Sequence, residues 1–578
     1  MSFLGVETSL TGRRWVGPGV DTDRAAQALE QSKGLPLALC GVLARRGVDA
    51  TQADTFLAPS LREMMPDPRS LKDVEKAAER FVRAVTRRER IAVFADYDVD
   101  GGSSAALLLT WLRQMGHSAT LYVPDRIDEG YGPNDAAMER LACDHDLIVC
   151  VDCGTLSHGP VAAASASDVI VLDHHLAGEE LPPALAVVNP NRQDESGDLS
   201  HLCAAAVVFL LLVEVRRQLR TSGQDSPDLM ALLDLVALAT VADVAPLVGV
   251  NRAFVRQGLK IMARRERVGL TALADVAGLD TAPTAYHLGY VLGPRVNAGG
   301  RIGSADLGAR LLATQDPHEA QALAEKLDQL NRERRDIEAS VRAAALAQAE
   351  ERGLDRALVW AAGPVWHPGV VGIVASRLKE AAGRPSIVIG IENGIGKGSG
   401  RSVSGIDLGQ PIQRLAAEGL LLKGGGHKMA AGLSVAEDKI DMAMARLTEL
   451  LEKQGAHQLG VSDLKVDGLV TAHAATVDLV EQIEKAGPFG AAAPAPRFVF
   501  ANSEIRYAKR VGETHLKVSF GSDAGRIDAI SFGAYDTELG PTLENHGGAR
   551  FHLAGRLEIN TWRGRQSVQL RLEDAARA

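Results

Sequence analysis

The sequence has few cysteines and no long hydrophobic run. A sparse, odd number of cysteines argues against a disulfide framework and predicts free thiols in a reducing compartment. No apolar run approaches the length that spans a bilayer, and the first residues lack the regions of a signal peptide. We therefore expect a cytoplasmic protein without membrane association. The five cysteines among the 578 residues are Cys40, Cys143, Cys150, Cys153 and Cys203.

Net positive charge is also missing. The chain has 63 Lys and Arg against 73 Asp and Glu, a formal net charge of −10. The surface as a whole is therefore not basic enough to attract nucleic acid, and any phosphate-binding surface must be local. The 46% hydrophobic content is that of a soluble globular protein with sizeable cores. At roughly 150 residues per domain, the length predicts about four domains.

From about residue 90 the chain alternates short apolar runs with helix-like stretches. The runs are rich in β-branched residues and bounded by turns, which predicts a parallel, doubly wound α/β sheet. An aspartate follows each of the first four runs, at the edge where such sheets place their sites. The five runs are 91–95, 119–123, 147–151, 169–172 and 185–188. The aspartates that follow them are Asp96, Asp125, Asp152 and Asp173.

The remainder of the chain changes character several times. Residues 203–280 have a helical pattern, and a long charged helical stretch then joins two lobes. A second α/β pattern follows, and the tail shows period-2 alternation typical of a small antiparallel barrel or sandwich. The first 90 residues carry no interpretable motif. The expected divisions are 1–90, 91–314, 315–352, 353–457 and 458–578.

Three carboxylates stand at alternate positions after the first run: Asp96, Asp98 and Asp100. Alternate acids on a turn can converge on one hard divalent cation. The spacing is that of the start of a calcium-binding EF-hand loop, but Leu107 stands where such a loop has its twelfth-position glutamate. A strand rather than a helix also precedes the acids. On their own, these acids fit a solvated turn equally well.

Two adjacent histidines follow the fourth run, in the triplet Asp173-His174-His175. Imidazoles with an acid to orient them suit a transition-metal ion better than calcium, although an isolated pair fits a structural role equally well. Asp152 and Asp243 are single acids in strongly apolar surroundings, and a buried carboxylate needs a partner or a metal. Together these side chains supply enough oxygen and nitrogen ligands for two ions. The mixed ligand set indicates Mn²⁺ or Mg²⁺.

Cys150 and Cys153 form a C-x-x-C pair, a spacing that also occurs in zinc sites and in redox motifs. The sequence contains no second such pair for a zinc site. Thioredoxin-like chemistry is disfavoured because the pair lies in an apolar strand rather than at a helix N-terminus. We interpret these cysteines as buried thiols.

In chain order, the segments ADYDVDG, VDCG, DHH and VADVAPL resemble the four motifs of the DHH phosphoesterase superfamily. Later segments resemble one family within it, the RecJ single-stranded-DNA-specific 5′–3′ exonucleases, and the resemblance covers about residues 90–575. It implies a parallel-sheet α/β DHH domain, a long helix, a second α/β domain of the DHHA1 type and a C-terminal all-β OB-fold. The later segments are GPRVNAGGRIGSA (293–305), WHPGVVGIVASRL (366–378), GSGRS (398–402) and GGGHKMAAG (424–432).

The resemblance also implies roles for individual residues. Asp100, Asp173 and His175 would support catalysis closely, with His175 stabilising charge on the scissile phosphate. The arginine-rich and GSGRS motifs would line a pocket for the 5′ end of the DNA. The implied metal ligands are Asp96, Asp98, Asp152, His174 and Asp243. The implied 5′-phosphate contacts are Arg301, Ser399 and Arg401, with Arg295 as a further candidate.

Physical chemistry agrees with a phosphate pocket. Arg301 and Arg401 can each bind phosphate oxygens bidentately. His427 beside three glycines favours a phosphate contact, its alternative being a surface-loop histidine. Trp562 between basic residues of a terminal hairpin is a combination that single strands favour, and it equally fits a tryptophan packed on the hairpin. Glycines in these motifs, although common in ordinary turns, would let backbone N–H groups approach an anion: Gly398, Gly400, Gly424, Gly425 and Gly426.

We therefore expect an exonuclease that releases 5′-mononucleotides from single-stranded DNA by two-metal hydrolysis, with Mn²⁺ or Mg²⁺. The resemblance implies work in DNA recombination and repair, with a single-strand-binding protein and a helicase as partners. One alternative is a phosphodiesterase of small substrates, such as cyclic dinucleotides or oligoribonucleotides, which would not need the OB-like region. A second is a non-catalytic DNA-binding scaffold, against which the full set of acids and histidines argues.

Overall fold

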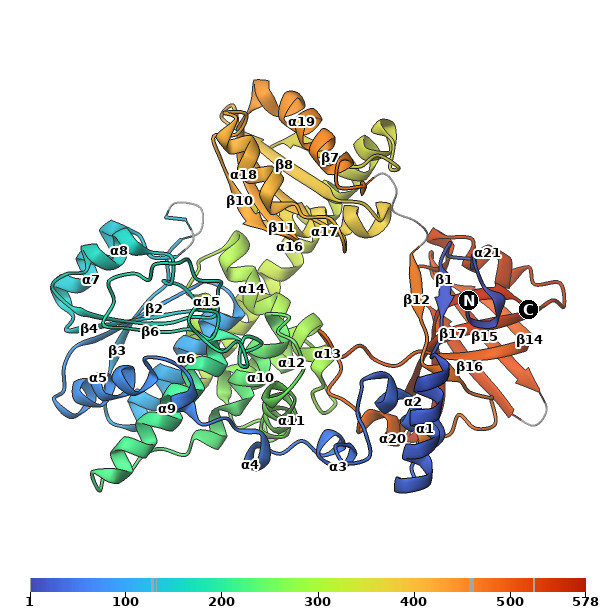
Figure 1. Cartoon of the computed structure of the whole chain (residues 1–578), viewed down its shortest axis with the longest axis horizontal. Coiled ribbons are helices and arrows are strands. Elements are labelled where there is room, and N and C mark those ends of the chain that lie inside the picture. Colours follow the sequence, from blue (N-terminus) through green and yellow to red (C-terminus); the bar gives the residue numbers. More distant parts are fainter. Residues whose placement is uncertain (1, 126–128, 131, 457–461, 523–524) are drawn as a thin grey trace. The chain divides into compact units, whose positions relative to one another are not determined.

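The computed structural model divides the chain into two compact units (Figure 1). Among the described residues, no helix combines the length and apolar character needed to cross a membrane. The structure describes residues 2–125, 129–130, 132–456, 462–522 and 525–578. Unit 1 comprises Met1–Met65, Pro246–Arg256 and Val461–Ala578, and unit 2 comprises Pro66–Ala245 and Gln257–Gly460.

Unit 2 contains the predicted parallel sheet. All its strands are parallel, in the order β3-β2-β4-β5-β6. Strands β2 and β4 are buried along their whole length, which explains their uninterrupted apolar sequences. The prediction of five parallel strands is confirmed. They are β2 (Ile91–Ala95), β3 (Ala119–Tyr122), β4 (Leu147–Val151), β5 (Asp168–Leu172) and β6 (Ala186–Val188).

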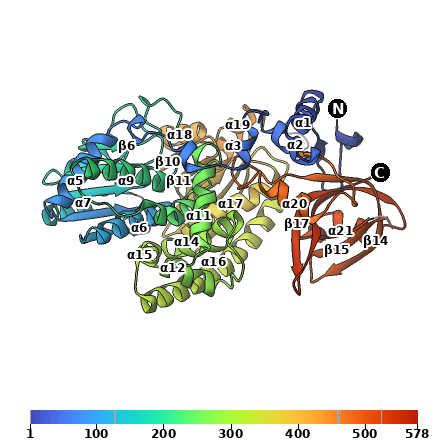
Figure 2. The ribbon, with the colours of Figure 1, turned by 90° about the horizontal axis from the view of Figure 1, so that it is seen from below.

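Helices cover both faces of this sheet. Phe94, Cys150 and Val171 point to one face and form a core with two helices, α7 (Asp135–Asp144) and α8 (His158–Ala163). Three further helices contact the strands from the other face, as Figure 2 shows from below. These are α5 (Val74–Thr86), α6 (Val99–Gln114) and α9 (Ala204–Thr221).

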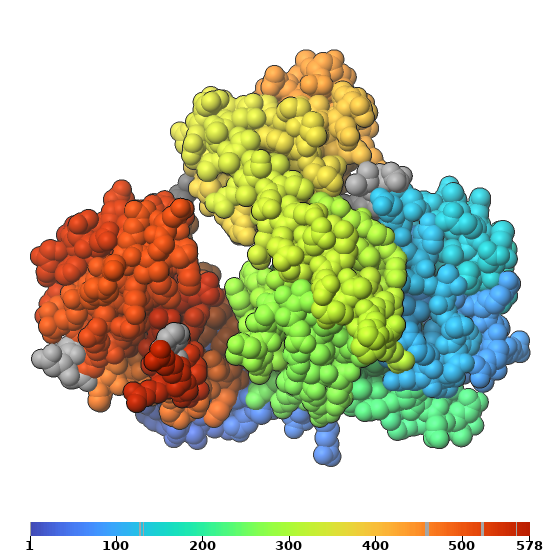
Figure 3. Space-filling model, turned by 180° about the vertical axis from the view of Figure 1, so that it is seen from behind, coloured from blue at the N-terminus to red at the C-terminus, as the bar shows by residue number. Residues whose placement is uncertain are grey.

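A helical layer leads from this sheet to a second one. Its last helix, α16 (Pro317–Arg352), is 36 residues long. The first half of α16 contacts α12, α14 and α15 of this layer, with Leu327 lying against Gly299. The second half contributes Val341 and Ala345 to the core of the second sheet. Figure 3 shows the surface of α16 as a continuous yellow-green band. The preceding helices are α10 (Leu233–Ala242), α12 (Val268–Val276), α14 (Gly293–Ile302) and α15 (Leu307–Ala313).

The second sheet is mixed, in the order β10-β11-β9-β8-β7. Helices α18 (Gly409–Ala417) and α19 (Ile440–Glu452) cover one face, and α17 (Pro368–Ala382) packs on the other together with the end of α16. Only β7 and β8 pair in parallel. The strands are β7 (Val359–Pro364), β8 (Ser386–Glu392), β9 (Ile395–Arg401), β10 (Lys423–His427) and β11 (Ala430–Ala436).

The glycines of β9 and β10 serve packing. The backbone of β9 is paired on both sides, by β8 and β11. Gly398 and Gly400 face the core under α18 and α19, where a Cβ would crowd leucine and isoleucine side chains within 3.0 Å. Gly424 and Gly426 are crowded in the same way, and only Gly425 faces open space. Because β9 is paired on both sides, the expectation that Gly398 and Gly400 expose N–H groups to an anion is wrong. For Gly424, Gly425 and Gly426, on the edge strand β10, it stays a prediction.

Unit 1 is built around a closed five-stranded barrel. Its strands follow the order β14-β15-β16-β18-β17, and β17 pairs back onto β14, as in an OB-fold. The all-β prediction for the tail is confirmed. Trp562 ends β17 opposite Arg565, in the predicted hairpin, but its side chain lies outside the described part of the chain. The strands are β14 (Phe498–Val511), β15 (His515–Ser522), β16 (Gly525–Ser531), β17 (Arg550–Trp562) and β18 (Arg565–Arg577).

The N-terminal region belongs to the same unit as the barrel. Strand β1 (Arg14–Val16) pairs in parallel with β12 (Asp463–Lys465). The buried Trp15 donates its Nε1–H to Asp574 at 2.9 Å, across 559 positions of sequence. Helices α1 (Val20–Lys33) and α2 (Leu37–Arg45) add leucines to the barrel core. Of the uninterpreted N-terminal region, residues 2–65 thus belong to the fold of unit 1, whereas residues 66–90, with α5, belong to unit 2.

Candidate active site

Three buried aspartates prolong the strands of the parallel sheet at its carboxyl edge. The backbone N–H groups of Asp96, Asp152 and Asp173 donate to carbonyl groups of the neighbouring strands at 3.3, 2.9 and 3.1 Å. None of the three is more than 3% exposed. Asp152 has a left-handed φ of 60°, a strained backbone typical of functional sites. The sheet therefore gathers carboxylates at the predicted edge.

The turn from β2 into α6 holds two further acids. Asp98 is the N-cap of α6, and its carboxylate accepts the N–H groups of Asp100 at 2.8 Å and Gly101 at 3.1 Å. A Cβ on Gly101 would collide with the carbonyl oxygen of Asp96, so the turn requires glycine here. The helix cap thus fixes Asp98 close to Asp96.

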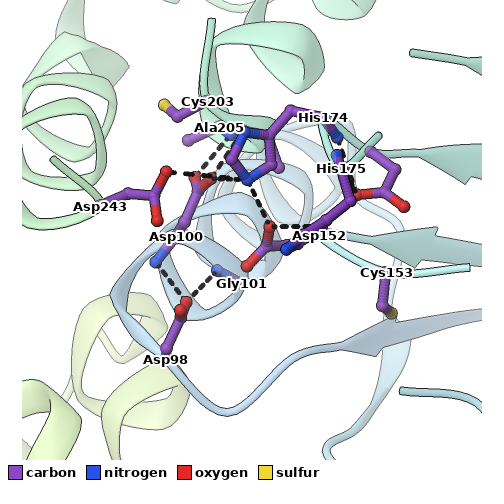
Figure 4. A network of polar contacts seen from close by, with 12 residues as sticks. Asp98, Asp100, Gly101, Asp152, Cys153, His174, His175, Cys203, Ala205 and Asp243 are labelled. Carbon is purple, nitrogen blue, oxygen red and sulfur yellow. Dashed lines mark hydrogen bonds and ion pairs between the residues drawn. The ribbon is translucent and has the colours of Figure 1, made fainter. Parts of the chain in front are cut away.

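Asp100 connects this turn to α9. Its two carboxylate oxygens accept the N–H groups of Ala204 at 2.6 Å and Ala205 at 2.8 Å, in the first turn of α9 (Figure 4). The side chain is fully buried. A carboxylate is favourable at a helix N-terminus because the unpaired N–H groups carry partial positive charge. Asp100 therefore holds α9 against α6.

His174 lies at the centre of the acids. Its Nε2 atom is 3.3 Å from a carboxylate oxygen of Asp152 and 3.7 Å from oxygens of Asp100 and Asp243 (Figure 4). Asp243 comes from the C-cap of α10, far along the chain from the others. The ring is mostly buried, with 18% of the side chain exposed.

Asp173 orients both histidines. Its Oδ1 atom accepts the N–H of His174 at 2.7 Å and the N–H of His175 at 3.2 Å, and lies 2.8 Å from the Nδ1 atom of His175. Its other oxygen accepts the N–H of Thr155 at 3.1 Å. The His175 side chain is 43% exposed, so a ligand can reach it.

The pKa values within the site diverge. Burial and the neighbouring carboxylates raise the pKa of Asp152 well above its ordinary value, and that of Asp243 to about 9. For Asp173, the hydrogen bonds and charge of His175 outweigh burial and lower the pKa. Burial lowers the pKa of His175, but the hydrogen bond and charge of Asp173 outweigh it and raise the pKa to about 9. Clustered carboxyls that resist ionisation are sites for which cations compete with protons.

The donor set fits divalent metal ions. Three overlapping groups each bring ligand atoms within 4.8 Å of one another, and Asp152 belongs to two of them. A carboxylate shared in this way can bridge two ions, and mixed oxygen and nitrogen ligands suit Mn²⁺ or Mg²⁺. Among the described residues, Asp125 belongs to no such group. The groups are Asp96, Asp98 and Asp152; Asp152, His174 and His175; and Asp100, His174 and Asp243.

A second cluster forms around the N-terminus of α17. Arg301 of α14 donates to the carbonyl of Gly369 at 3.0 Å. On β9, Arg401 donates to the Oγ atom of Ser399 at 3.0 Å. A Cβ on Gly372 would lie 3.1 Å from that Oγ atom and 3.2 Å from Nη2 of Arg401. Two guanidinium groups and a hydroxyl thus lie beside the first turns of α17, a combination suited to a phosphate.

Two other predicted phosphate contacts, Arg295 and His427, lie outside the cluster at α17. Arg295 forms an ion pair with Asp328 at 2.9 Å and donates to the carbonyl of Val291, so it joins α14 to α16. His427 pairs with Ala430, which pairs in turn with Arg401. Residues in direct register share a face of a sheet, so His427 lies on the Arg401 face, two strands away.

Several supporting residues escaped the sequence interpretation. Asn189 donates to the carbonyl of His175 at 2.8 Å, and Asn191 donates to that of His174 at 2.5 Å. Both asparagines directly follow β6 in the sequence N-P-N, a polar turn after the fifth apolar run that could have indicated them. Asn297 of α14 accepts the N–H of Val99, beside the metal-site turn.

Comparisons with known proteins agree with this architecture. The chain is 40% identical over 573 residues to the single-stranded-DNA-specific exonuclease RecJ of Dickeya dadantii (strain 3937), covering 95% of this chain and 98% of that protein. It is 38% identical to that of Escherichia coli (strain K12), covering 93% and 96%. Family models match at residues 90–240 (DHH family, N-terminal domain), 355–453 (DHHA1 domain) and 466–574 (RecJ OB domain).

A solved structure shares most of the fold. The chain superposes on the crystal structure of RecJ in complex with Mn²⁺ from Thermus thermophilus with a TM-score of 0.81 and 29% sequence identity. The match covers 98% of this chain and 79% of that one.

Proposed function

Because the chain belongs to the RecJ family, we propose that it hydrolyses single-stranded DNA from the 5′ end and releases 5′-mononucleotides. The observation that carries the proposal is the position of α14. Gly300 of this helix packs on the ring of Tyr97, between two acids of the metal site, while the next residue, Arg301, reaches the cluster at α17. One helix thus contacts the turn of the proposed cation centre and contributes an arginine to the proposed phosphate pocket, an arrangement that suits the removal of terminal nucleotides.

The metal ligands of this proposal are one histidine and four acids. When bound, two divalent cations would activate a water molecule and neutralise charge on the phosphoryl group. Mn²⁺ or Mg²⁺ suits the donor set, and a structural relative contains Mn²⁺. The proposed ligands are Asp96, Asp98, Asp152, His174 and Asp243.

The chain's own residues orient the reacting groups. Asp173 holds His175 with its Nδ1–H engaged, which leaves the exposed side of the cationic ring to donate to an oxygen of the scissile phosphate. Asp100 acts as a positioning residue, because it fixes α9 behind the metal ligands.

The phosphate cluster sets the direction of attack. Arg301, Ser399 and Arg401 would bind the 5′-terminal phosphate, placing the first phosphodiester at the cation centre. We include His427 as a contact farther along the same sheet face. We propose no direct phosphate contact for Arg295, which holds α14 in place beside Arg301.

The proposal also assigns a role to the OB-fold barrel and to each of the other domains. The OB-fold unit would hold the strand by backbone contacts and stacking, with Trp562 as a candidate stacking residue. The proposed divisions are those of the sequence: an N-terminal region, a catalytic domain, a connecting helix, a DHHA1 domain and the OB-fold. Work in recombination and repair in the cytoplasm, with a single-strand-binding protein and a helicase, belongs to the same proposal.

Digestion of end-labelled DNA tests the function. Single-stranded DNA carrying a 5′ or a 3′ label is incubated with the protein and Mn²⁺, beside a matched duplex. We expect rapid release of the 5′ label as mononucleotide from the single strand only. Asp98→Ala should abolish release, whereas Asp125→Ala should retain it because Asp125 follows a neighbouring strand outside the metal groups. Release from the 3′ end first, or cleavage of dinucleotides alone, would contradict the proposal.

A further inference from the structure

Two tyrosines form an exposed stack on unit 2. Tyr286 and Tyr290 are 53% and 68% exposed. Their ring centroids lie 5.1 Å apart with an interplanar angle of 25°. Single exposed apolar side chains are common, but two large rings stacked on each other form a contiguous exposed aromatic surface, which is a feature of binding sites. Tyr286 lies in α13 (Ala285–His287), and Tyr290 lies in the π-helical turn η4 (Leu288–Leu292). Such turns recur at functional sites.

The turn that carries Tyr290 packs against the helix that ends beside the cation centre. A Cβ on Gly289 would be 3.3 Å from Val241, and a Cβ on Gly293 would be 3.1 Å from Ala242, so η4 packs directly on the end of α10. The next residue of the chain, Asp243, points at His174. Helix α10 contacts both η4 and α14, whose surroundings are labelled in Figure 1.

The tyrosines also share a helical face with the phosphate cluster. The helical run continues from α13 through η4 into α14. Tyr290, Asn297 and Arg301 are separated by seven and four residues, about two turns and one turn, and so lie along one side. At 1.5 Å per residue, Tyr290 is about 16 Å from Arg301 along the axis. Asn297, which contacts the metal-site turn, lies between them.

We infer that Tyr286 and Tyr290 form a stacking platform for unpaired bases downstream of the scissile phosphodiester. The inference rests on the proposed function: a strand whose 5′ phosphate lies at Arg301 and whose first linkage lies at the cations would reach the tyrosines if it continues along α14 past Asn297. Aromatic faces bind successive bases of any sequence. Duplex bases present no free face, so the platform also favours single strands.

Abasic scanning tests the platform. The binding of 5′-phosphorylated 12-mers, each with one abasic site, is measured by fluorescence anisotropy with full-length protein carrying Asp98→Ala, which keeps the DNA intact. We expect about tenfold weaker binding for an abasic site at one or two positions near the 5′ end. Adding Tyr290→Ala should weaken binding of the unmodified 12-mer about as much and cause no further loss at those positions.

Kinetic measurements and a control variant distinguish a loss of base stacking from a general disturbance of the fold. In the active protein, Tyr290→Ala should raise KM for the 12-mer with little change in kcat, and Tyr290→Phe should restore it. Met442→Ala removes an equally exposed apolar side chain from α19 and should change neither parameter.

Other outcomes overturn the inference. If the loss of binding caused by Tyr290→Ala adds to the loss caused by an abasic site at every position, the tyrosines do not stack on bases. A lower kcat in Tyr290→Ala that Tyr290→Phe does not restore would lead to the same conclusion. Unchanged binding of the 12-mer after Tyr290→Ala would likewise show that the platform does not bind DNA. If the active protein cleaves no single strand, the proposed function fails, whereas the abasic scan still decides whether the tyrosines bind bases.

Discussion

The Oδ1 atom of Asp173 lies 2.8 Å from the Nδ1 atom of His175. The same carboxylate accepts the backbone N–H groups of both site histidines and of Thr155. Asp173→Asn replaces this acceptor by an amide that cannot serve all these donors. We expect a 10- to 100-fold loss of kcat/KM, as for other groups that orient metal ligands, and a loss of about 1–3 kcal/mol in unfolding free energy.

Single-turnover digestion and urea unfolding measure these two effects of Asp173→Asn. Asp225→Asn, at an exposed carboxylate, is the matched control and should change neither quantity. Full activity in Asp173→Asn would show that the orientation of His175 does not depend on this hydrogen bond.

The raised pKa of Asp243, about 9, predicts a pH dependence of metal stabilisation. Without metal, the folded protein keeps this carboxyl protonated where the unfolded chain has released the proton. Its stability contribution therefore falls as pH rises from about 4 towards 9. A divalent cation removes this penalty because it binds the ionised form. We expect Mg²⁺ to raise the Tm more at pH 8.5 than at pH 6.

Thermal unfolding with Mg²⁺ or with chelator, across this pH range, measures the difference. Asp243→Asn should reduce the pH dependence of the metal-free protein, and the raised pKa of Asp152 should maintain part of it. A metal-induced rise in Tm that is equal at both pH values would mean that binding displaces no proton from the site.

The buried cysteines should be inert in the folded protein. Cys143 is exposed, and the other four are buried. Burial raises the pKa of Cys150 to about 12 and that of Cys153 well above its ordinary value. Since the thiolate is the reactive form, a thiol reagent at pH 8 should modify about one group in the native protein and all five after unfolding. Cys143→Ser should remove the native reaction, and rapid labelling of that variant would contradict the burial of Cys150.

The sequence was most informative where local pattern and chemistry coincide. Asp96, Asp152 and Asp173 could be predicted to converge because each follows a short apolar run, and parallel strands end at a common edge. Histidines beside an acid then indicated the metal. The same reasoning could not select among the edge acids, which is why Asp125 was included although it joins no metal group among the described residues.

Other features depend on contacts between distant parts of the chain. Trp15 gives no local signal that its partner is Asp574, so the place of the N-terminal residues in unit 1 could not be predicted. Gly398 and Gly400 resembled an anion-binding loop because composition does not reveal which face of a strand is crowded. Tyr286 and Tyr290 belong to no motif in the sequence, and only their exposure identifies them.

Variants of Arg401 and Arg295 should have different effects, because we expect Arg401 to recognise phosphate and Arg295 to stabilise helix packing. Arg401→Ala removes a guanidinium from the cluster at α17, and we expect a loss of about 10- to 100-fold in kcat/KM on 5′-phosphorylated DNA, with a much smaller loss on 5′-hydroxyl DNA. Arg295→Ala should keep the preference for a 5′ phosphate but lower the unfolding free energy by about 1 kcal/mol, because Asp328 loses one of its two arginine partners. Parallel digestion of the two DNA forms and urea unfolding measure both effects. Equal losses on both DNA forms in Arg401→Ala would place the terminal phosphate elsewhere.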